Sequence, residues 1–125
     1  MQFLHQTKFG KENGNCFAAC VASLFGRPIE DIPDFHEVRV QGNWWVAFEN
    51  WLETYGLLPV MFDDPLPAGF PLDCYYIVGG ISPRAPDMLH ACIGYGGEII
   101  HDPHPDGRGL KVITDYTFFI RTFKP

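Results

Sequence analysis

The chain has 125 residues, of which 46% are hydrophobic and 15% aromatic, enough for a single domain over residues 1–125 to form a core without metals or disulfides. Its formal net charge of -6 argues against nucleic acid as a partner, because phosphate binding requires a basic surface. No apolar run is long enough to cross a membrane, and the N-terminus lacks the features of a signal peptide. We therefore expect a cytoplasmic protein.

The first predicted helix carries a cysteine at its start. Residues 1–15 are polar and predict an extended lead-in, whereas residues 16–25 favour a helix. Asn15 fits the N-cap position and Gly26 ends the helix. Cys16 therefore lies in the first turn, where backbone N–H groups are unpaired and the helix dipole is positive. Four apolar residues recur at helical spacing in this segment: Phe17, Cys20, Val21 and Leu24.

A second helix is predicted over residues 43–55, after a surface turn or helical fragment at 28–35. Gly56 supplies its C-terminal stop. Its apolar face is aromatic, and we expect it to belong to the core rather than to a ligand-stacking surface. The residues of that face are Trp44, Phe48, Trp51, Leu52 and Tyr55.

The remainder of the chain predicts strands. Residues 74–78 are apolar throughout and favour a central strand, and Gly96-Gly97 is a strong hairpin signal between two others. Helices followed by antiparallel strands indicate an α+β protein. The predicted strands cover residues 57–62, 74–78, 88–95, 98–101 and 117–121.

Three of the four cysteines are expected to be buried thiols. Cys20, Cys74 and Cys92 all lie in apolar segments, and an intracellular setting disfavours disulfides. Cys16 differs from them by its place at a helix start after Gly14-Asn15. We expect it to be the reactive thiol.

The hairpin over residues 88–102 brings His90 and Asp102 together if its turn has three residues. That turn would pair Gly94 with Glu98, and the same register would place His90 directly opposite Asp102. Directly opposed residues have Cβ atoms about 4.5–5.5 Å apart on one face. A two-residue turn at Gly96-Gly97 would shift the register by one residue and remove this opposition.

Cys16, His90 and Asp102 supply the three groups that thiolate chemistry needs. A helix N-terminus and a neighbouring imidazolium both favour the thiolate, and a carboxylate fixes the imidazole tautomer. The set predicts a small cysteine hydrolase that acts on a peptide, amide or isopeptide bond through a thioester.

The Asn15-Cys16 helix start, followed by His90 and by Asp102-Pro103 on the next strand, resembles papain-like cysteine peptidases. It is most similar to the bacteriocin-leader peptidases of ABC exporters and their free-standing bacterial and phage relatives. Glutamine, cysteine, histidine and aspartate follow in that order in the family. The resemblance covers nearly the whole chain in the order of elements. It implies a papain-like α+β fold with the cysteine-bearing helix packed on an antiparallel sheet.

The resemblance also implies a role for each residue. Cys16 is the nucleophile, His90 the general base and then the general acid, and Asp102 the orienting carboxylate. The family's glutamine donates its side-chain amide to the oxyanion hole, beside the backbone N–H of the cysteine. Gln6 is the best match and Gln2 a weaker one.

Two departures from the family pattern concern the surroundings of the cysteine. Gln6 lies ten positions before Cys16, further than is usual in the family, so residues 8–14 are expected to form an excursion. Phe17 stands where the exporter peptidases usually carry glycine, which affects the expected peptide specificity.

Alternative functions remain open. A divalent metal could bind His90, His101, Asp102 and His104, but Pro103 distorts this segment and no zinc-binding spacing supports it. We expect His101 and His104 to be exposed, and the triad requires neither metal nor cofactor. The chain could also be a papain-like binding module without activity. The same triad serves acyl transfer and deamidation, which also pass through a thioester.

The expected partner is a peptide or protein substrate. Residues 79–87 predict a loop leading into the strand that carries His90, and this loop is well placed to line a cleft. Trp44-Trp45 is a second segment expected to line it.

Overall fold

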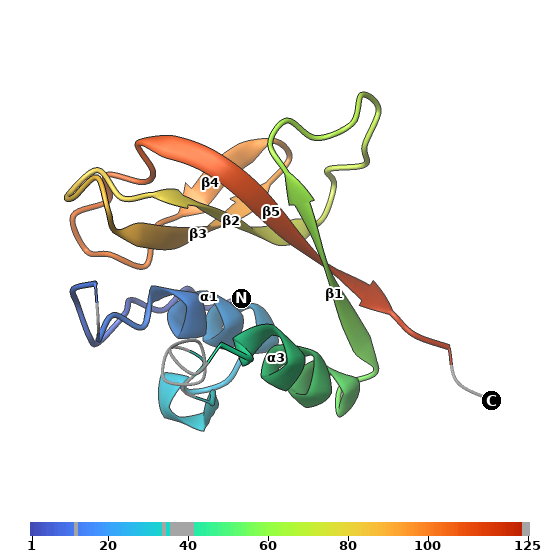
Figure 1. Ribbon diagram of the computed structural model, residues 1–125. Coiled ribbons are helices and arrows are strands. Elements are labelled where there is room, and N and C mark those ends of the chain that lie inside the picture. Colours follow the sequence, from blue (N-terminus) through green and yellow to red (C-terminus); the bar gives the residue numbers. More distant parts are fainter. Residues whose placement is uncertain (12, 34, 36–41, 124–125) are drawn as a thin grey trace.

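The computed structural model covers residues 1–125 and is described for residues 1–11, 13–33, 35 and 42–123. Within these residues, helices lie against one side of a five-stranded antiparallel sheet (Figure 1). None of the described helices has the length and apolar composition that crossing a membrane requires. The helical elements are α1 (Cys16–Phe25), η1 (Ile29–Asp31) and α3 (Trp44–Glu53), and the strands are β1 (Leu57–Asp63), β2 (Tyr75–Ile81), β3 (Leu89–Tyr95), β4 (Glu98–His101) and β5 (Val112–Arg121).

This arrangement confirms the predicted α+β class with an N-terminal helix. Each of the five predicted strand ranges overlaps one observed strand. The 3-10 helix η1 confirms the helical fragment expected within 28–35, of which residue 34 lies outside the described part. The lead-in before α1 has neither helix nor strand in its described residues, 1–11 and 13–15.

Helix α1 has the predicted bounds, but its N-terminus is not capped as predicted. Gly26 adopts a left-handed conformation with φ 65° and donates its N–H to the carbonyls of Ala22 and Ser23, a conformation that favours glycine. Asn15 occupies the N-cap position, yet its side chain makes no capping hydrogen bond. The capping prediction is wrong because that side chain is bound to the lead-in instead.

Helix α3 carries the predicted aromatic face into the core. Phe48 and Leu52 are fully buried, and Phe48 makes edge-to-face contacts with Phe17 and Phe35. Tyr55 lies just past the helix and is 38% exposed. Phe48 and Leu52 therefore place this part of the aromatic stripe in the core, as predicted, whereas Trp44 at the start of the helix lines a cavity.

Two hydrophobic clusters enclose the sheet. The first, which includes Ile77 and Ile93, packs against α1 and α3. The second, around Tyr76 and Phe118, is covered by residues from the segment that follows β1. The strand order is β1-β5-β2-β3-β4, so the predicted central position of residues 74–78 is confirmed for β2.

Strand β2 extends further than predicted. It runs through Ile81, so Gly79 and Gly80 belong to the strand and not to the expected loop over 79–87. The reason is pairing on both sides, because Gly80 lies opposite His90 of β3 and opposite Ile113 of β5. Strand β5 likewise begins earlier than predicted, at Val112, where it pairs with β2.

The turn between β3 and β4 has two residues, so the register that a three-residue turn would give does not form and His90 is not directly opposite Asp102. Tyr95 pairs with Glu98, and the turn residues Gly96 and Gly97 have φ values of 65° and 88°. Two successive positive φ values are typical of the tight type I′ hairpin turn. With this turn alone, His90 and Asp102 would point to opposite faces.

A second register shift restores the shared face. The pairing shifts between Ile93 and Gly94, so that Ile93 lies opposite His101. Continued by one residue, this register places Asp102 level with Cys92. His90 is two positions from Cys92, and residues two apart along a strand share a face. The bulge therefore directs Asp102 toward His90.

Candidate active site

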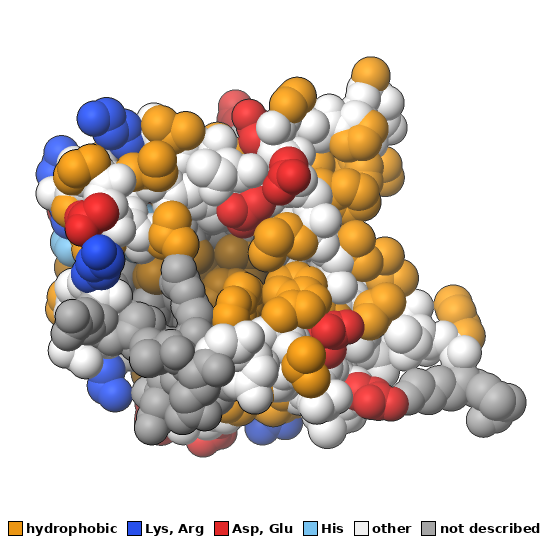
Figure 2. Space-filling model, in the orientation of Figure 1, with side chains coloured by type: hydrophobic (Ala, Val, Ile, Leu, Met, Phe, Trp, Pro, Cys, Tyr) orange, Lys and Arg blue, Asp and Glu red, His pale blue; other side chains and the backbone are white. Residues whose placement is uncertain are grey.

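A cavity of about 1050 Å³ lies between the helices and the sheet. Figure 2 shows a hollow there with largely hydrophobic walls and acidic side chains on its border. Gln6, Cys16 and His90 all line the cavity. The structure thus brings three of the four predicted catalytic residues to one surface that a ligand can reach.

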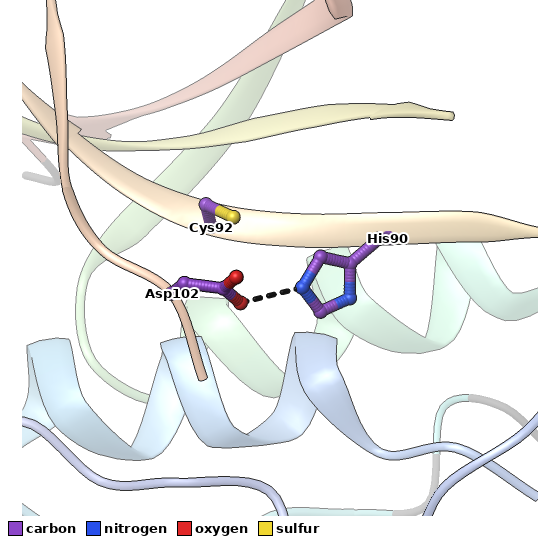
Figure 3. Close-up of side chains that lie close together, drawn as sticks. All are labelled: His90, Cys92 and Asp102. Atoms are coloured by element: carbon purple, nitrogen blue, oxygen red, sulfur yellow. Dashed lines mark hydrogen bonds and ion pairs between the residues drawn. The ribbon is translucent and has the colours of Figure 1, made fainter. Parts of the chain in front are cut away.

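The fourth residue, Asp102, binds His90 from behind this surface. His90 Nε2 lies 2.6 Å from Asp102 Oδ1, and the two side chains are 3% and 6% exposed (Figure 3). Asp102 Oδ1 also accepts the N–H of His104 at 2.9 Å, and Oδ2 accepts that of Gly109 at 2.7 Å. These bonds fix both carboxylate oxygens, so the carboxylate sets the orientation of the imidazole ring.

The charges of this pair support one another. Burial disfavours the imidazolium, but interactions with Asp102, Cys16 and Cys92 outweigh it and raise the pKa of His90 to about 11. Burial likewise opposes the Asp102 carboxylate, but hydrogen bonds from His90 and from two backbone N–H groups lower its pKa to about 2. His90 and Asp102 therefore form an imidazolium–carboxylate pair at neutral pH.

Cys16 lines the same cavity as the imidazole of His90. It is the first residue of α1 and is partly buried, and it is one of the groups that raise the pKa of the imidazole. Asp102 occupies Nε2, which leaves Nδ1 as the ring nitrogen available to the thiol. A thiol, an imidazole and a carboxylate, the three groups that nucleophilic catalysis requires, are thus brought to one place.

The remaining thiols have different surroundings. Cys20 and Cys92 are fully buried, as predicted, and burial raises the pKa of each thiol. The prediction for Cys74 is wrong, because it is exposed. It lies in the bend that precedes β2, where side-chain alternation into the core has not begun. Partial burial and the neighbouring Asp73 raise its thiol pKa.

Gln6 has the surroundings of an anchored amide. It is 7% exposed, and its backbone N–H donates to the Pro103 carbonyl at 2.9 Å. Its Nε2 donates to the Lys8 carbonyl at 2.9 Å, which leaves the second amide hydrogen for another acceptor. Its Oε1 is buried and has no partner among the described residues. The alternative, Gln2, is exposed and does not line the cavity.

Asn15 connects Gln6 to Cys16, a role that the sequence analysis missed. Its Oδ1 accepts the backbone N–H groups of Thr7 and Lys8 at 3.0 and 2.9 Å, and its Nδ2 donates to Thr7 Oγ1 at 2.9 Å. Its own N–H donates to the Lys8 carbonyl at 3.2 Å. These bonds close the expected excursion over 8–14, of which residue 12 is not described. They fix the lead-in beside the helix start.

Cys92 is a second neighbour of the pair that sequence reasoning did not connect with the site. The ligand atoms of His90, Cys92 and Asp102 lie within 4.8 Å of one another (Figure 3). A metal there would have to replace the 2.6 Å His90–Asp102 hydrogen bond and bind a thiol whose pKa burial raises. The chemistry of this group therefore favours an ion pair over a metal centre.

The other two histidines of the alternative metal set have different partners. His101 Nε2 binds the Leu4 carbonyl at 2.8 Å, and its ring stacks on Phe3 at 5.0 Å. His104 lines the cavity, with its ring centroid 6.4 Å from that of His90. Both are partly buried, so their predicted exposure is wrong, because the lead-in covers this end of the hairpin.

No known protein family matches the chain, and no curated protein or solved structure is significantly similar to it. A fold class alone does not define an activity. The chemistry of the site residues must therefore carry the functional assignment.

Proposed function

We propose that this protein is a cysteine hydrolase of papain-like type that cleaves a peptide or amide bond through a thioester. The observation that carries the proposal is the position of His90, which is hydrogen-bonded to Asp102 at 2.6 Å and lines one cavity with Cys16 at the start of α1. Nucleophile, base and orienting group are the parts that thiol catalysis requires. The papain-like classification is supported by the cysteine at the start of α1 and the histidine on the facing sheet.

In the first half of the reaction, Cys16 reacts as the thiolate, its proton having passed to His90, and its sulfur attacks the carbonyl carbon of the substrate. The carbonyl π electrons move to oxygen, and the resulting tetrahedral intermediate collapses as the C–N bond breaks. His90 transfers its proton to the departing nitrogen, so an amine leaves and a thioester remains on Cys16. Asp102 keeps the ring aligned throughout.

In the second half, His90 removes a proton from water. The hydroxide oxygen attacks the thioester carbon, the C–S bond breaks, and a carboxylic acid leaves. If an amine takes the place of water, the same steps give acyl transfer. The partner that reaches the thioester therefore decides between hydrolysis and transfer.

Each tetrahedral intermediate carries a negative oxygen that needs hydrogen-bond donors. The backbone N–H of Cys16 is one of the unpaired donors at the start of α1. Gln6 is the second proposed donor, because it lines the same cavity and has one amide hydrogen free of Lys8. Two neutral donors stabilise the oxyanion without adding charge to the site.

The test is covalent labelling by a peptidyl vinyl sulfone, with the adduct mapped by mass spectrometry. We expect one adduct, on Cys16, which disappears in Cys16→Ala and persists in the control Cys74→Ser. Hydrolysis of fluorogenic peptide amides should be lost in Cys16→Ala and His90→Ala. Labelling at Cys74 alone, or turnover that survives Cys16→Ala, would overturn the assignment.

A further inference from the structure

We propose that the cavity beside Cys16 selects a substrate segment with a lysine or arginine side chain, which is bound by Asp115 against aromatic side chains. This inference rests on the proposed function, because it takes the molecule that binds in the cavity to be the substrate of the hydrolase. It assigns that substrate a chemical class: an extended peptide with a cationic side chain close to the bond that is cleaved.

One wall of the cavity is aromatic. Phe17, Phe35 and Trp44 all line it, and Phe17 contacts both other rings edge to face, at 6.2 and 5.7 Å between centroids. Lysine and arginine bury their aliphatic stems against such surfaces, and their charged ends are attracted to aromatic faces.

The opposite wall carries the carboxylate of Asp115. This residue of β5 lies opposite Gly79 of β2, and both line the cavity. A Cβ atom on Gly79 would lie 2.3 Å from Asp115 Oδ1, so the carboxylate leans over the backbone of β2. Glycine at this position leaves the space that the carboxylate occupies. The Asp115 carboxylate is thus directed across β2 toward β3, the strand that carries His90.

Of the described charged residues that line the cavity, Asp115 is the one without an ion pair to another described residue. Lys11 forms an ion pair with Asp87 at 2.8 Å, and Arg84 forms one with Asp106 at 3.0 Å. Among the described residues, Asp115 has no ion pair, and its Oδ2 accepts only the hydroxyl of Thr114, at 2.7 Å.

A second carboxylate strengthens the negative field. Asp63 of β1 lies directly opposite Asp115, so the two side chains share a face with Cβ atoms about 4.5–5.5 Å apart. Like charges in opposed positions destabilise a sheet. A cation bound between them would relieve this repulsion. Figure 2 shows acidic side chains on the border of the hollow.

Gln6 provides an independent indication that the cavity binds a hydrogen-bond donor. It is 7% exposed and lines the cavity, yet its Oε1 has no partner among the described residues. An unpartnered buried acceptor costs free energy unless a ligand supplies a donor. A peptide N–H is such a donor. Because Oε1 is itself buried, a peptide N–H can bind it once the Gln6 side chain turns toward the cavity.

The distances suit a side chain near the cleaved bond. Gly79 lies opposite Ala91, the neighbour of His90, at an interstrand spacing of about 4.8 Å. An extended peptide advances about 3.3 Å per residue. A lysine or arginine within one or two residues of the cleaved bond can thus reach the Asp115 carboxylate.

The first test uses two thiol reagents of similar size and opposite charge on the full chain with Cys74→Ser. Aminoethyl methanethiosulfonate is cationic and sulfoethyl methanethiosulfonate is anionic. Cys16 sulfur attacks the sulfenyl sulfur of either reagent, a disulfide forms and methanesulfinate leaves. Asp115→Asn should lower the ratio of cationic to anionic rates at Cys16 by about 3- to 10-fold. The control Glu98→Gln, which removes an exposed charge from β4, should change it by less than about 2-fold.

The second test measures hydrolysis of a tetrapeptide library of coumarin amides. We expect lysine or arginine at one position to raise kcat/KM by about 10-fold over glutamine, chiefly through KM, and Asp115→Asn to remove that preference. Hydrolysis without a preference for lysine or arginine overturns the inference whatever the reagents show. If the library is not hydrolysed at all, the proposed hydrolase activity fails for these substrates. The cation site is then judged by the thiol reagents alone: an unchanged ratio of cationic to anionic rates in Asp115→Asn overturns it.

Discussion

Replacement of Asp102 by asparagine tests the centre of the proposed triad with almost no change of shape. The carboxylate accepts three hydrogen bonds, from His90, from the N–H of His104 and from the N–H of Gly109. An asparagine has only one acceptor oxygen. Whichever way its amide is turned, an NH₂ group faces a donor. The substitution therefore removes a charge and creates one mismatched contact.

The pKa shifts of Asp102 and His90 set the size of the expected loss of stability and the pH range over which it depends on pH. Hydrogen bonding to Asp102 lowers its pKa from 3.8 to about 2, and at about 1.36 kcal/mol per unit this corresponds to roughly 2–3 kcal/mol. A lowered carboxyl pKa stabilises the fold above the unfolded value, and this stability is lost as pH falls toward 2. The raised pKa of His90, about 11, acts in the opposite direction. Its contribution is complete below the unfolded value near 6.5 and is lost as pH rises toward 11.

Urea unfolding followed by tryptophan fluorescence measures these effects directly. At pH 7, Asp102→Asn should lower the free energy of unfolding by roughly 2–3 kcal/mol. The loss of stability above pH 7 should also be shallower than in the wild type. Turnover should fall by about 10²–10⁴-fold, because the imidazole is no longer held in one tautomer. A folded variant with wild-type turnover and an unchanged alkaline slope would refute the ion pair.

Three further predictions concern Cys16, Gln6 and Asn15. Limited iodoacetamide at neutral pH should label Cys16 before Cys74, the exposed competitor, and peptide mapping that finds Cys74 first would contradict the site. Gln6→Ala should lower turnover by about 10²–10³-fold. Alkylation of Cys16 should be nearly unchanged in this variant, since alkylation forms no oxyanion. Equal losses in both assays would indicate a structural role for Gln6. Asn15→Ala should lower kcat by about 10-fold or more through displacement of Gln6. Asn15→Asp should restore most of it by keeping the acceptor for Thr7 and Lys8, and failure of this rescue would remove Asn15 from the site.

The helical part of the site could be predicted because its signals are local. Cys16 lies at the start of α1, and Gly26 ends the helix in a left-handed conformation. Both features follow from residues within one helix length. The role of Asn15 could not be predicted in the same way. N-cap preference is a statistical property of the position, whereas the observed bonds to Thr7 and Lys8 depend on how the lead-in folds back onto the helix.

The subsite around Asp115 was also out of reach of sequence reasoning. Its strand was predicted to begin only at residue 117, whereas β5 begins at Val112 and its first residues are mostly exposed. The opposition of Asp115 to Gly79 depends on the order of β5 and β2 in the sheet. Strand order is a property of the whole chain, and no local pattern specifies it.

The contact between His90 and Asp102 was predicted from a wrong register, and the geometry of strands explains why it nevertheless forms. The two-residue turn moves the pairing by one residue from the predicted register, and the shift between Ile93 and Gly94 moves it by one more in the same direction. A total displacement of two residues preserves the face of every side chain. Asp102 therefore comes level with Cys92 instead of His90, and its carboxylate reaches the imidazole diagonally. The same displacement places the Cys92 thiol beside the pair, where the sequence predicted only an ordinary core cysteine.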